Sequence, residues 1–160
     1  MEVLERIEKI LDLYTKHEKM IAFAESCTGG YICHMITNVS GSSKVFERGI
    51  ICYSNEAKME LLNVDRGILE EFGAVSEPVA QQLCQNIRTQ AKVDVGIGIT
   101  GIAGPTGGTP EKPVGLFYIG FSSPQETKVD KYLIDADRLT FKKRVLDIVL
   151  SLLEYYIQNI

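Results

Sequence analysis

The sequence contains no tryptophan and only two histidines, and its four cysteines form no CxxC pair. Structural zinc sites usually combine cysteine and histidine ligands at short, regular spacings. We expect no structural zinc, because no such spacing occurs among the cysteines and histidines of the chain, which are Cys27, Cys33, Cys52, Cys84, His17 and His34. We interpret Cys33, Cys52 and Cys84 as small core residues in a reducing compartment.

A surplus of basic residues and a long apolar run are also missing. The net charge is −4 and the isoelectric point is near 5.3, which gives no electrostatic reason to expect a nucleic-acid or anionic membrane partner. The only basic run, 142–144, would spread around a helix as a solvated face. No apolar run approaches the roughly 18 residues that cross a bilayer, and the first ten residues do not resemble a secretory signal. We therefore expect a soluble, cytoplasmic protein with no nucleic-acid and no membrane partner.

The length of 160 residues and the 45% hydrophobic content suit one domain with a full core. Hydrophobic periodicity and helix-end signals predict helices over 2–17, 29–38, 55–62, a stretch ending at Gly73, 77–92 and 137–158. Apolar and β-branched runs predict strands over 20–24, 48–54, 93–100, 114–123 and 126–134. Helices between the early strands and a hairpin late in the chain imply an α/β fold. We expect a single domain over 1–160, built as a three-layer α/β/α sandwich with a mixed β-sheet.

Several helix ends and one helix face follow from particular residues. We expect Ser54 or Asn55 to cap the helix over 55–62, and Ser76 to cap the helix that follows it at 77–92. Gly73 is the expected C′ residue of the helix before it. On the closing helix, the residues expected to point inward are Leu139, Val145, Leu146, Val149, Leu152, Leu153 and Tyr156.

The segment "ESCTGG", residues 25–30, joins a predicted strand to a predicted helix. Taken alone, this segment favours a plain helix cap by Ser26 or Thr28. The alternative is chemical, because a strand-to-helix corner places side chains next to free backbone N–H groups. Such groups suit a phosphate or the oxyanion of acyl transfer. Two hydroxyls, one thiol and one carboxylate are many polar groups for a plain cap.

The segment "YSNEAK", residues 53–58, places Tyr53 at the end of a strand and Lys58 one turn into the next helix. Lys58 shares its helix face with Leu61 and Leu62. Spacing alone modestly favours a lysine whose stem is buried and whose ammonium reaches water. A fully buried amine would instead have a lowered pKa and could act as a general base. A nucleophilic serine needs such a partner, and neither histidine is well placed to serve.

A third segment, 96–113, is rich in glycine. Gly96, Gly98 and Gly101 spell GxGxxG, but the first two lie inside a predicted strand. Pro105 and Pro110 prevent the helix that a dinucleotide-binding fingerprint requires, so we regard the match as accidental. No GK[ST] sequence is present, which excludes a Walker loop. The segment could form the wall of a ligand pocket or a mobile connector without a ligand.

Together, "AESCTGG", "GSSKVFERGIICYSNEAK", "GAVSEPVA" and "TGIAGPTGGTPEKPVG" resemble, in this order, the CinA C-terminal domain family. That family includes stand-alone nicotinamide-nucleotide amidases. The resemblance covers nearly the whole chain, from about residue 5 to the last helix. It implies an α/β/α domain that hydrolyses the carboxamide of nicotinamide mononucleotide to nicotinate mononucleotide and ammonia, in pyridine-nucleotide salvage. It also implies a metal-independent enzyme without a cofactor, and a homodimer.

The resemblance implies specific roles for residues of the three segments. Ser26 would be the nucleophile, Lys58 its base and Tyr53 an assisting residue. We expect N–H groups at the start of the helix over 29–38, with the turn at Thr100 and Gly101, to hold the oxyanion. The candidate substrate-binding residues are Cys27, Thr28, Gly29, Gly30, Thr100, Gly101, Gly104, Gly107, Gly108, Arg138 and Lys142.

The closing motif departs from the family pattern. The family usually has Gly-Asp-Arg followed a turn later by one or two arginines, whereas this chain reads "ADRLTFKKR". Ala136 replaces the glycine, Arg138 is kept, and Lys142 and Lys143 stand at the arginine positions. Lysine supplies charge without the bidentate geometry of arginine, which bears on how a substrate phosphate is bound. This departure leaves open a catalytically idle nucleotide-binding or regulatory module. Cys27 also stays open as the nucleophile, because a thiolate at a helix N-terminus is activated too. A DNA-processing accessory fits the acidic charge balance poorly.

Overall fold

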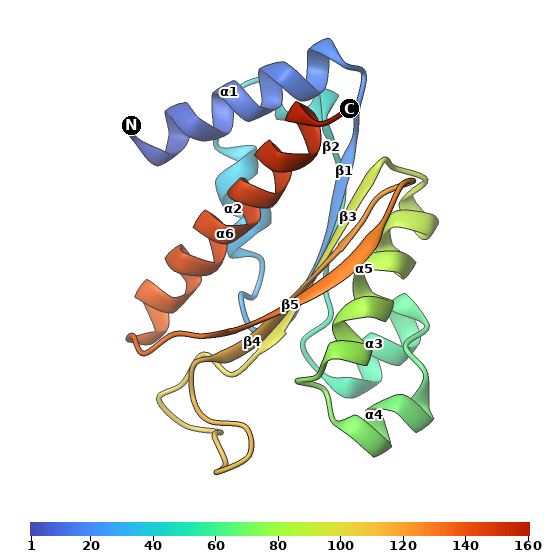
Figure 1. Cartoon of the computed structure of the whole chain (residues 1–160), viewed down its shortest axis with the longest axis vertical. Helices are drawn as coiled ribbons and strands as arrows, with labels where there is room; N and C mark the ends of the chain where they lie inside the picture. Colours follow the sequence, from blue (N-terminus) through green and yellow to red (C-terminus); the bar gives the residue numbers. More distant parts are fainter.

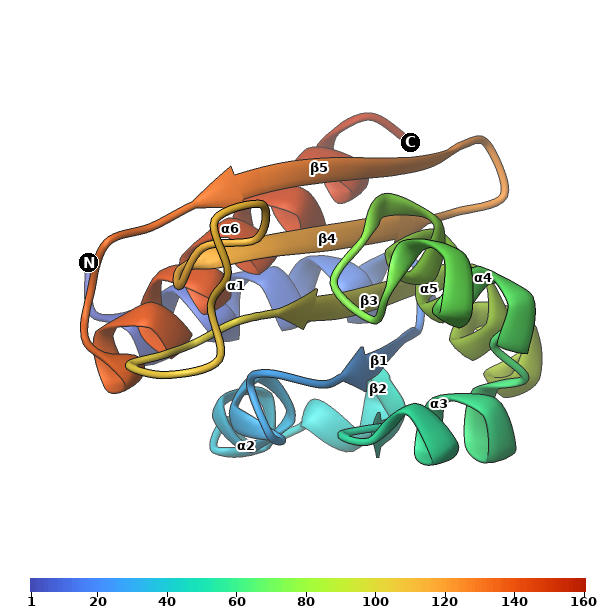
Figure 2. The same cartoon turned by 90° about the horizontal axis from the view of Figure 1, so that it is seen from below.

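The computed structural model describes all residues, 1–160, and is built around one five-stranded mixed sheet. The strands lie in the order β2-β1-β3-β4-β5, as the view in Figure 2 shows from β5 at the top to β2 at the bottom. Parallel pairing joins β1 to β2 and to β3, and antiparallel pairing joins β3 to β4 and β4 to β5. The strand bounds are β1 Ile21–Glu25, β2 Phe46–Ile51, β3 Val95–Gly101, β4 Leu116–Ser122 and β5 Thr127–Leu133.

Helices cover both faces of this sheet (Figure 1). One face carries α1 (Val3–Lys16), α2 (Tyr31–Thr37) and α6 (Arg138–Gln158). The other carries α3 (Asn55–Leu62), α4 (Arg66–Phe72) and α5 (Glu77–Ala91). The apolar core is divided accordingly, with Phe23 and Ile97 packed on the first side and Ala22 and Ala24 on the second. The predicted three-layer α/β/α sandwich with a mixed sheet is confirmed.

The glycines of β3 and β4 allow α5 to lie very close to the sheet. A Cβ added to Gly96 would lie 2.3 Å from the carbonyl oxygen of Cys84, and one added to Gly98 would lie 2.6 Å from its nitrogen. A Cβ on Gly120 would lie 2.4 Å from the carbonyl oxygen of Ala80. Real carbon atoms cannot approach so closely, so any side chain here would push the helix away. The first two glycines of the GxGxxG match thus serve helix–sheet packing, which explains the match without a dinucleotide.

Most predicted elements occur within a few residues of their expected bounds, but three details were wrong. The strand predicted over 48–54 is Phe46–Ile51, because the chain leaves the sheet at Cys52 to begin the turn into α3. Leu139 is 61% exposed, because in the first turn of α6 only the side that carries Phe141 is covered. Ser76 stands at the N-cap position of α5, but its hydroxyl donates to the carbonyl of Gly73 instead of capping the helix. At α3, Ser54 is the capping residue, because its side chain accepts from the N–H of Ala57.

The three parallel strands end at one edge of the sheet. β1 ends at Glu25, β2 at Ile51 and β3 at Gly101, so the segments that follow them meet there. The connection after β1 leads to β2 on one side, and the connection after β3 leads to β4 on the other. Ligands of open α/β sheets bind at such a point, where neighbouring connections diverge. None of the helices has the length and apolar content needed to cross a membrane.

Candidate active site

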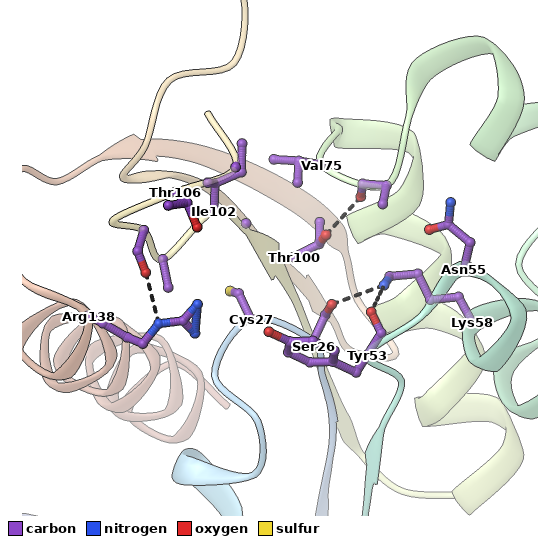
Figure 3. A pocket seen from close by; sticks show the side chains of 15 residues that line it. Ser26, Cys27, Tyr53, Asn55, Lys58, Val75, Thr100, Ile102, Thr106 and Arg138 are labelled. Carbon is purple, nitrogen blue, oxygen red and sulfur yellow. Dashed lines mark hydrogen bonds between the residues drawn. The ribbon is translucent and has the colours of Figure 1, made fainter. Parts of the chain in front are cut away.

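Ser26 and Lys58 meet at this edge. The Nζ atom of Lys58 lies 3.0 Å from the Oγ atom of Ser26, although the two residues are 32 positions apart in the chain (Figure 3). Nζ also donates to the carbonyl oxygens of Cys52, at 2.9 Å, and Tyr53, at 3.2 Å. The amine is therefore held between the end of β2 and the corner that follows β1.

Lys58 is 1% exposed, so the interpretation of an ammonium group reaching water was wrong. The Ser54 cap starts α3 directly after the end of β2, and Lys58 then lies one turn into the helix, facing the sheet edge. No carboxylate forms a salt bridge with its amine. Burial lowers the pKa of Lys58 from the ordinary value of 10.5, because removal from water disfavours the charged form. This arrangement favours the neutral amine that a general base requires.

The corner between β1 and α2 is organised by Glu25. Its side chain is fully buried and accepts four hydrogen bonds. Oε2 accepts from the hydroxyl of Thr28 at 2.6 Å and from the N–H groups of Gly30 at 3.0 Å and Ile32 at 3.2 Å. Oε1 accepts from the N–H of Cys33 at 2.8 Å. The carboxylate thus satisfies the N–H groups that an α-helix leaves free in its first turn.

This arrangement corrects the expected oxyanion donors. The N–H groups at the start of α2 donate to Glu25, so they are not free to bind a ligand. The N–H of Gly29 donates to the carbonyl of Ser26. The N–H groups of Cys27 and Thr28 donate to no group of the chain, and the one that directly follows the proposed nucleophile is the usual position of an oxyanion donor at a strand-to-helix corner.

A cavity of about 260 Å³ opens next to Ser26 and Lys58. Nine of the residues singled out in the sequence line it: Ser26, Cys27, Tyr53, Lys58, Thr100, Gly101, Gly104, Gly107 and Arg138. Figure 3 shows that they come from different parts of the chain, including the β1–α2 corner, the glycine-rich loop and the start of α6. The glycine-rich segment is thus a pocket wall, which is the first of the two interpretations left open above.

Five predicted binding residues lie outside the cavity lining: Thr28, Gly29, Gly30, Gly108 and Lys142. Thr28 is buried against Glu25, and Gly30 donates to the same carboxylate. A Cβ on Gly108 would lie 2.6 Å from the nitrogen of Val114, so this glycine allows the loop to fold on itself. Lys142 lies beside Gly29, with Nζ 3.7 Å from the Cβ position of that glycine.

Three lining residues have defined contacts of their own. Arg138 donates from Nε to the carbonyl of Gly104 at 2.8 Å, which leaves the rest of its guanidinium directed into the cavity (Figure 3). Thr100 is buried and donates from its hydroxyl to the carbonyl of Ala74 at 2.8 Å. The side chain of Tyr53 is 61% exposed, and only its backbone carbonyl bonds Lys58. The assisting role expected of Tyr53, either to relay a proton or to hold Lys58 in place, stays a prediction.

Cys27 also lines the cavity, but its thiol is poorly suited to attack. Burial raises the pKa of Cys27 to about 12, and the neighbouring Glu25 carboxylate acts in the same direction. A thiol is an effective nucleophile only as the thiolate. All four cysteines are free, and Cys52 and Cys84 are buried as predicted, whereas Cys33 is only partly buried.

Sequence reasoning missed part of this site. It counted the carboxylate of Glu25 without assigning it a role, although an acid at the end of an otherwise apolar buried strand is an unusual residue. It also missed six lining residues: Asn55, Ala74, Val75, Ile102, Ala103 and Thr106. Asn55, Ile102, Ala103 and Thr106 lie within segments that were already singled out. Ala74 and Val75 belong to the quoted motif "GAVSEPVA", to which no role in the site was assigned.

The model of the CinA C-terminal domain family matches residues 4–157. A CinA-like protein of Kosmotoga olearia is 50% identical over 143 residues, which are 89% of this chain and 34% of that protein. The chain spans 34–38% of the length of the curated relatives that it matches.

Solved structures share the fold. A competence/damage inducible protein of Agrobacterium tumefaciens is 34% identical, with a TM-score of 0.88 over 97% of this chain and 93% of that one. A CinA superfamily protein of Klebsiella pneumoniae 700603 has a TM-score of 0.94 over the full length of both chains. At 23% identity, this second likeness concerns the fold alone.

Proposed function

The chain belongs to the CinA C-terminal domain family, and from that premise we propose that it hydrolyses the carboxamide of nicotinamide mononucleotide. The products are nicotinate mononucleotide and ammonia. The observation that carries this proposal is the buried amine of Lys58, without a carboxylate partner, 3.0 Å from the hydroxyl oxygen of Ser26. Serine–lysine pairs of this kind perform acyl transfer on several unrelated folds.

The two backbone carbonyls around Lys58 direct its lone pair. A neutral amine has two N–H bonds, and the carbonyl oxygens of Cys52 and Tyr53 lie within hydrogen-bond distance to accept them. The lone pair then faces the third neighbour, the hydroxyl oxygen of Ser26, which lies 3.0 Å from Nζ. In the proposed mechanism, that hydroxyl donates its proton to Nζ. A charged lysine would use all three N–H bonds as donors and have no lone pair for this proton. Burial thus favours the neutral form of the amine, and the geometry of the site leaves its lone pair for the Ser26 proton.

The reaction proceeds through an ester. Oγ of Ser26 attacks the carboxamide carbon while its proton moves to Nζ of Lys58, and the N–H of Cys27 stabilises the negative oxygen that forms. Lys58 then gives this proton to the leaving nitrogen, the C–N bond breaks, and ammonia departs. Water next attacks the ester carbon and loses a proton to the same amine. Return of that proton to Oγ releases the carboxylate product and restores Ser26.

The other wall of the cavity suits the phosphate of a mononucleotide. Arg138 directs its guanidinium into the cavity, and the N–H groups of Thr106 and Gly107 donate to no group of the chain. Guanidinium and free backbone N–H groups are the usual phosphate ligands of proteins. Lys142 lies one turn after Arg138 on α6 and adds a second positive charge near the corner. The identity of the substrate as a nicotinamide nucleotide rests on the family resemblance.

The proposal is tested by incubating the purified protein with nicotinamide mononucleotide and measuring ammonia together with nicotinate mononucleotide. We expect both products in equal amounts. Binding of the mononucleotide by calorimetry without any ammonia would instead support the idle nucleotide-binding module. The expected homodimer stays a prediction, which sedimentation of the same preparation would check.

A further inference from the structure

Glu25 is a buried acid without a cationic partner. Its side chain is fully buried, and none of the salt bridges in the structure includes it. Its compensation comes instead from the hydroxyl of Thr28 and the N–H groups of Gly30, Ile32 and Cys33. Burying an acid is expensive unless its oxygens are fully bonded. Four hydrogen bonds from one short segment mean that this acid and that segment hold each other in place.

The residues held in this way surround the proposed nucleophile. Glu25 immediately precedes Ser26, and its four donors lie between positions 28 and 33. The carboxylate therefore closes a loop of chain around the Ser26 corner. The backbone of Ser26 is fixed on the other side by donation of its N–H to the carbonyl of Ile99 in β3. Both constraints fix the backbone from which Oγ of Ser26 reaches Nζ of Lys58.

The same carboxylate acts on Cys27. A cysteine just before a helix is normally activated, because free N–H groups in the first helical turn stabilise its thiolate. Here those N–H groups are already bonded to a negative side chain. The charged groups that face the thiol are Glu25 from β1, which raises its pKa, and Lys58 from α3 and Lys142 from α6, which lower it. Burial acts in the same direction as Glu25 and is the larger effect.

We propose that Glu25 is a positioning residue that orients Ser26 toward Lys58 and keeps the adjacent Cys27 as an unreactive thiol. The first half of this inference rests on the proposed function, because it concerns the same nucleophile. The second half does not depend on any substrate. Glu25 thus acts together with burial to favour Ser26 over its neighbour Cys27 as the nucleophile of this corner.

The kinetic test compares Glu25→Gln with the wild-type protein. Glutamine keeps the shape of the side chain but carries no charge. Its NH₂ group cannot accept a hydrogen bond, so it replaces an acceptor oxygen with a second donor. We expect kcat to fall at least tenfold while KM changes less than threefold, because orientation of the nucleophile is lost and the substrate-binding wall is untouched. A folded Glu25→Gln variant with kcat within twofold of wild type would overturn the positioning role.

The thiol test uses iodoacetamide at pH 8 with mass spectrometry of the modified peptides. Cys27 lines the cavity and is 6% exposed, so the measured quantity is the ratio of its alkylation rates in the two proteins. Removal of the negative charge is expected to speed alkylation of Cys27 at least tenfold. Cys84 is the internal control, because it is a fully buried residue of α5 that faces the sheet, and its pKa is raised by burial without any contribution from Glu25. Equal acceleration at Cys27 and Cys84 would mean general loosening and would overturn the proposal, as would no acceleration at Cys27.

A milder pair of variants serves if Glu25→Gln does not fold. Thr28→Val removes one of the four donors, and Thr28→Ser keeps it. We expect kcat to fall several-fold in Thr28→Val and clearly less in Thr28→Ser, and equal losses in the two would overturn the positioning role. If the wild-type protein releases no ammonia, the proposed function fails, and the alkylation experiment still decides the inference about Cys27.

Discussion

The middle of the sheet and its carboxyl edge bury very different residues. In the middle, β1 and β3 bury side chains such as Phe23, Ile97 and Ile99, or no side chain at all where α5 approaches. The carboxyl edge accounts for most of the buried polar side chains of the chain: Glu25, Ser26, Thr28, Lys58 and Thr100. Burying polar groups lowers stability unless each is bonded. Their concentration at one edge indicates that this edge is built for chemistry, whereas the middle is built for stability.

The comparison predicts that Ser26→Ala separates activity from stability most completely. Removing the nucleophile should reduce ammonia release from nicotinamide mononucleotide by about 10³-fold or more. The fold should persist, because no apolar contact of the core is lost. Ammonia release and thermal unfolding would be measured on the same preparation, and wild-type turnover by the folded variant would remove Ser26 from the mechanism.

The second prediction concerns Lys58→Met, which keeps an unbranched buried side chain and removes the amine. Loss of a general base typically lowers the rate about 10²- to 10⁴-fold.

The pH dependence of stability should change as well. The folded pKa of Lys58 lies below 10.5, so the unfolded chain binds more protons between these two values, and wild-type stability rises with pH across that window. Lys58→Met should lack this contribution in denaturant titrations at several pH values, and an identical pH dependence in both proteins would contradict the buried neutral amine.

A substitution in the middle of the sheet should behave in the opposite way. Gly98→Ala would place a Cβ 2.6 Å from the nitrogen of Cys84 and 2.6 Å from the Cβ of Leu83, so α5 must shift. We expect a loss of about 1–3 kcal/mol in the free energy of unfolding. As a control, Gly67→Ala in α4 meets only the side chain of Asp65 and should change that energy by less than about 1 kcal/mol. Equal effects of the two substitutions would show that α5 does not pack as closely as the structure indicates.

The smallest effect is expected for Cys27→Ala. The substitution removes the thiol and keeps the backbone N–H that the mechanism uses. Because the pKa of Cys27 is raised to about 12, its thiol does not serve as the nucleophile at neutral pH. Ammonia release should stay within about threefold of wild type. A loss comparable to that of Ser26→Ala would instead assign the attack to Cys27.

Much of the fold could be predicted because it depends on local signals. The helix over 55–62 and the helix end at Gly73 follow from neighbouring residues, and each occurs in the structure. Of the two caps expected for the first helix, Ser54 and Asn55, the structure has Ser54. The inward orientation predicted for Leu139 was wrong, because it too was inferred from a local signal alone. Periodicity assigns a residue to a helix face, but it does not say how much of that face the sheet covers.

The site could be predicted only in part, because its decisive contacts are not local. Residue spacing placed Lys58 on an apolar helix face. Its amine is buried because it lies against Ser26, which is distant in the sequence, and against the carbonyl of Cys52 after β2. The role of Glu25 depends on how α2 folds back over the end of β1, so the oxyanion donors were assigned to N–H groups that the carboxylate already uses. Family resemblance supplied the roles of Ser26 and Lys58 before their contact was known.

The most direct test is an NMR titration of the Lys58 side chain in protein labelled with ¹³C and ¹⁵N at lysine, with Lys58→Met used to assign its signal. The mechanism requires that the pKa of Lys58 lies below the ordinary lysine value of 10.5. Burial lowers this pKa, and the amine lies beside one hydroxyl and two carbonyl oxygens. A midpoint clearly below 10.5 is predicted. A midpoint at or above that value would leave Ser26 without a base at neutral pH and would contradict the serine–lysine mechanism.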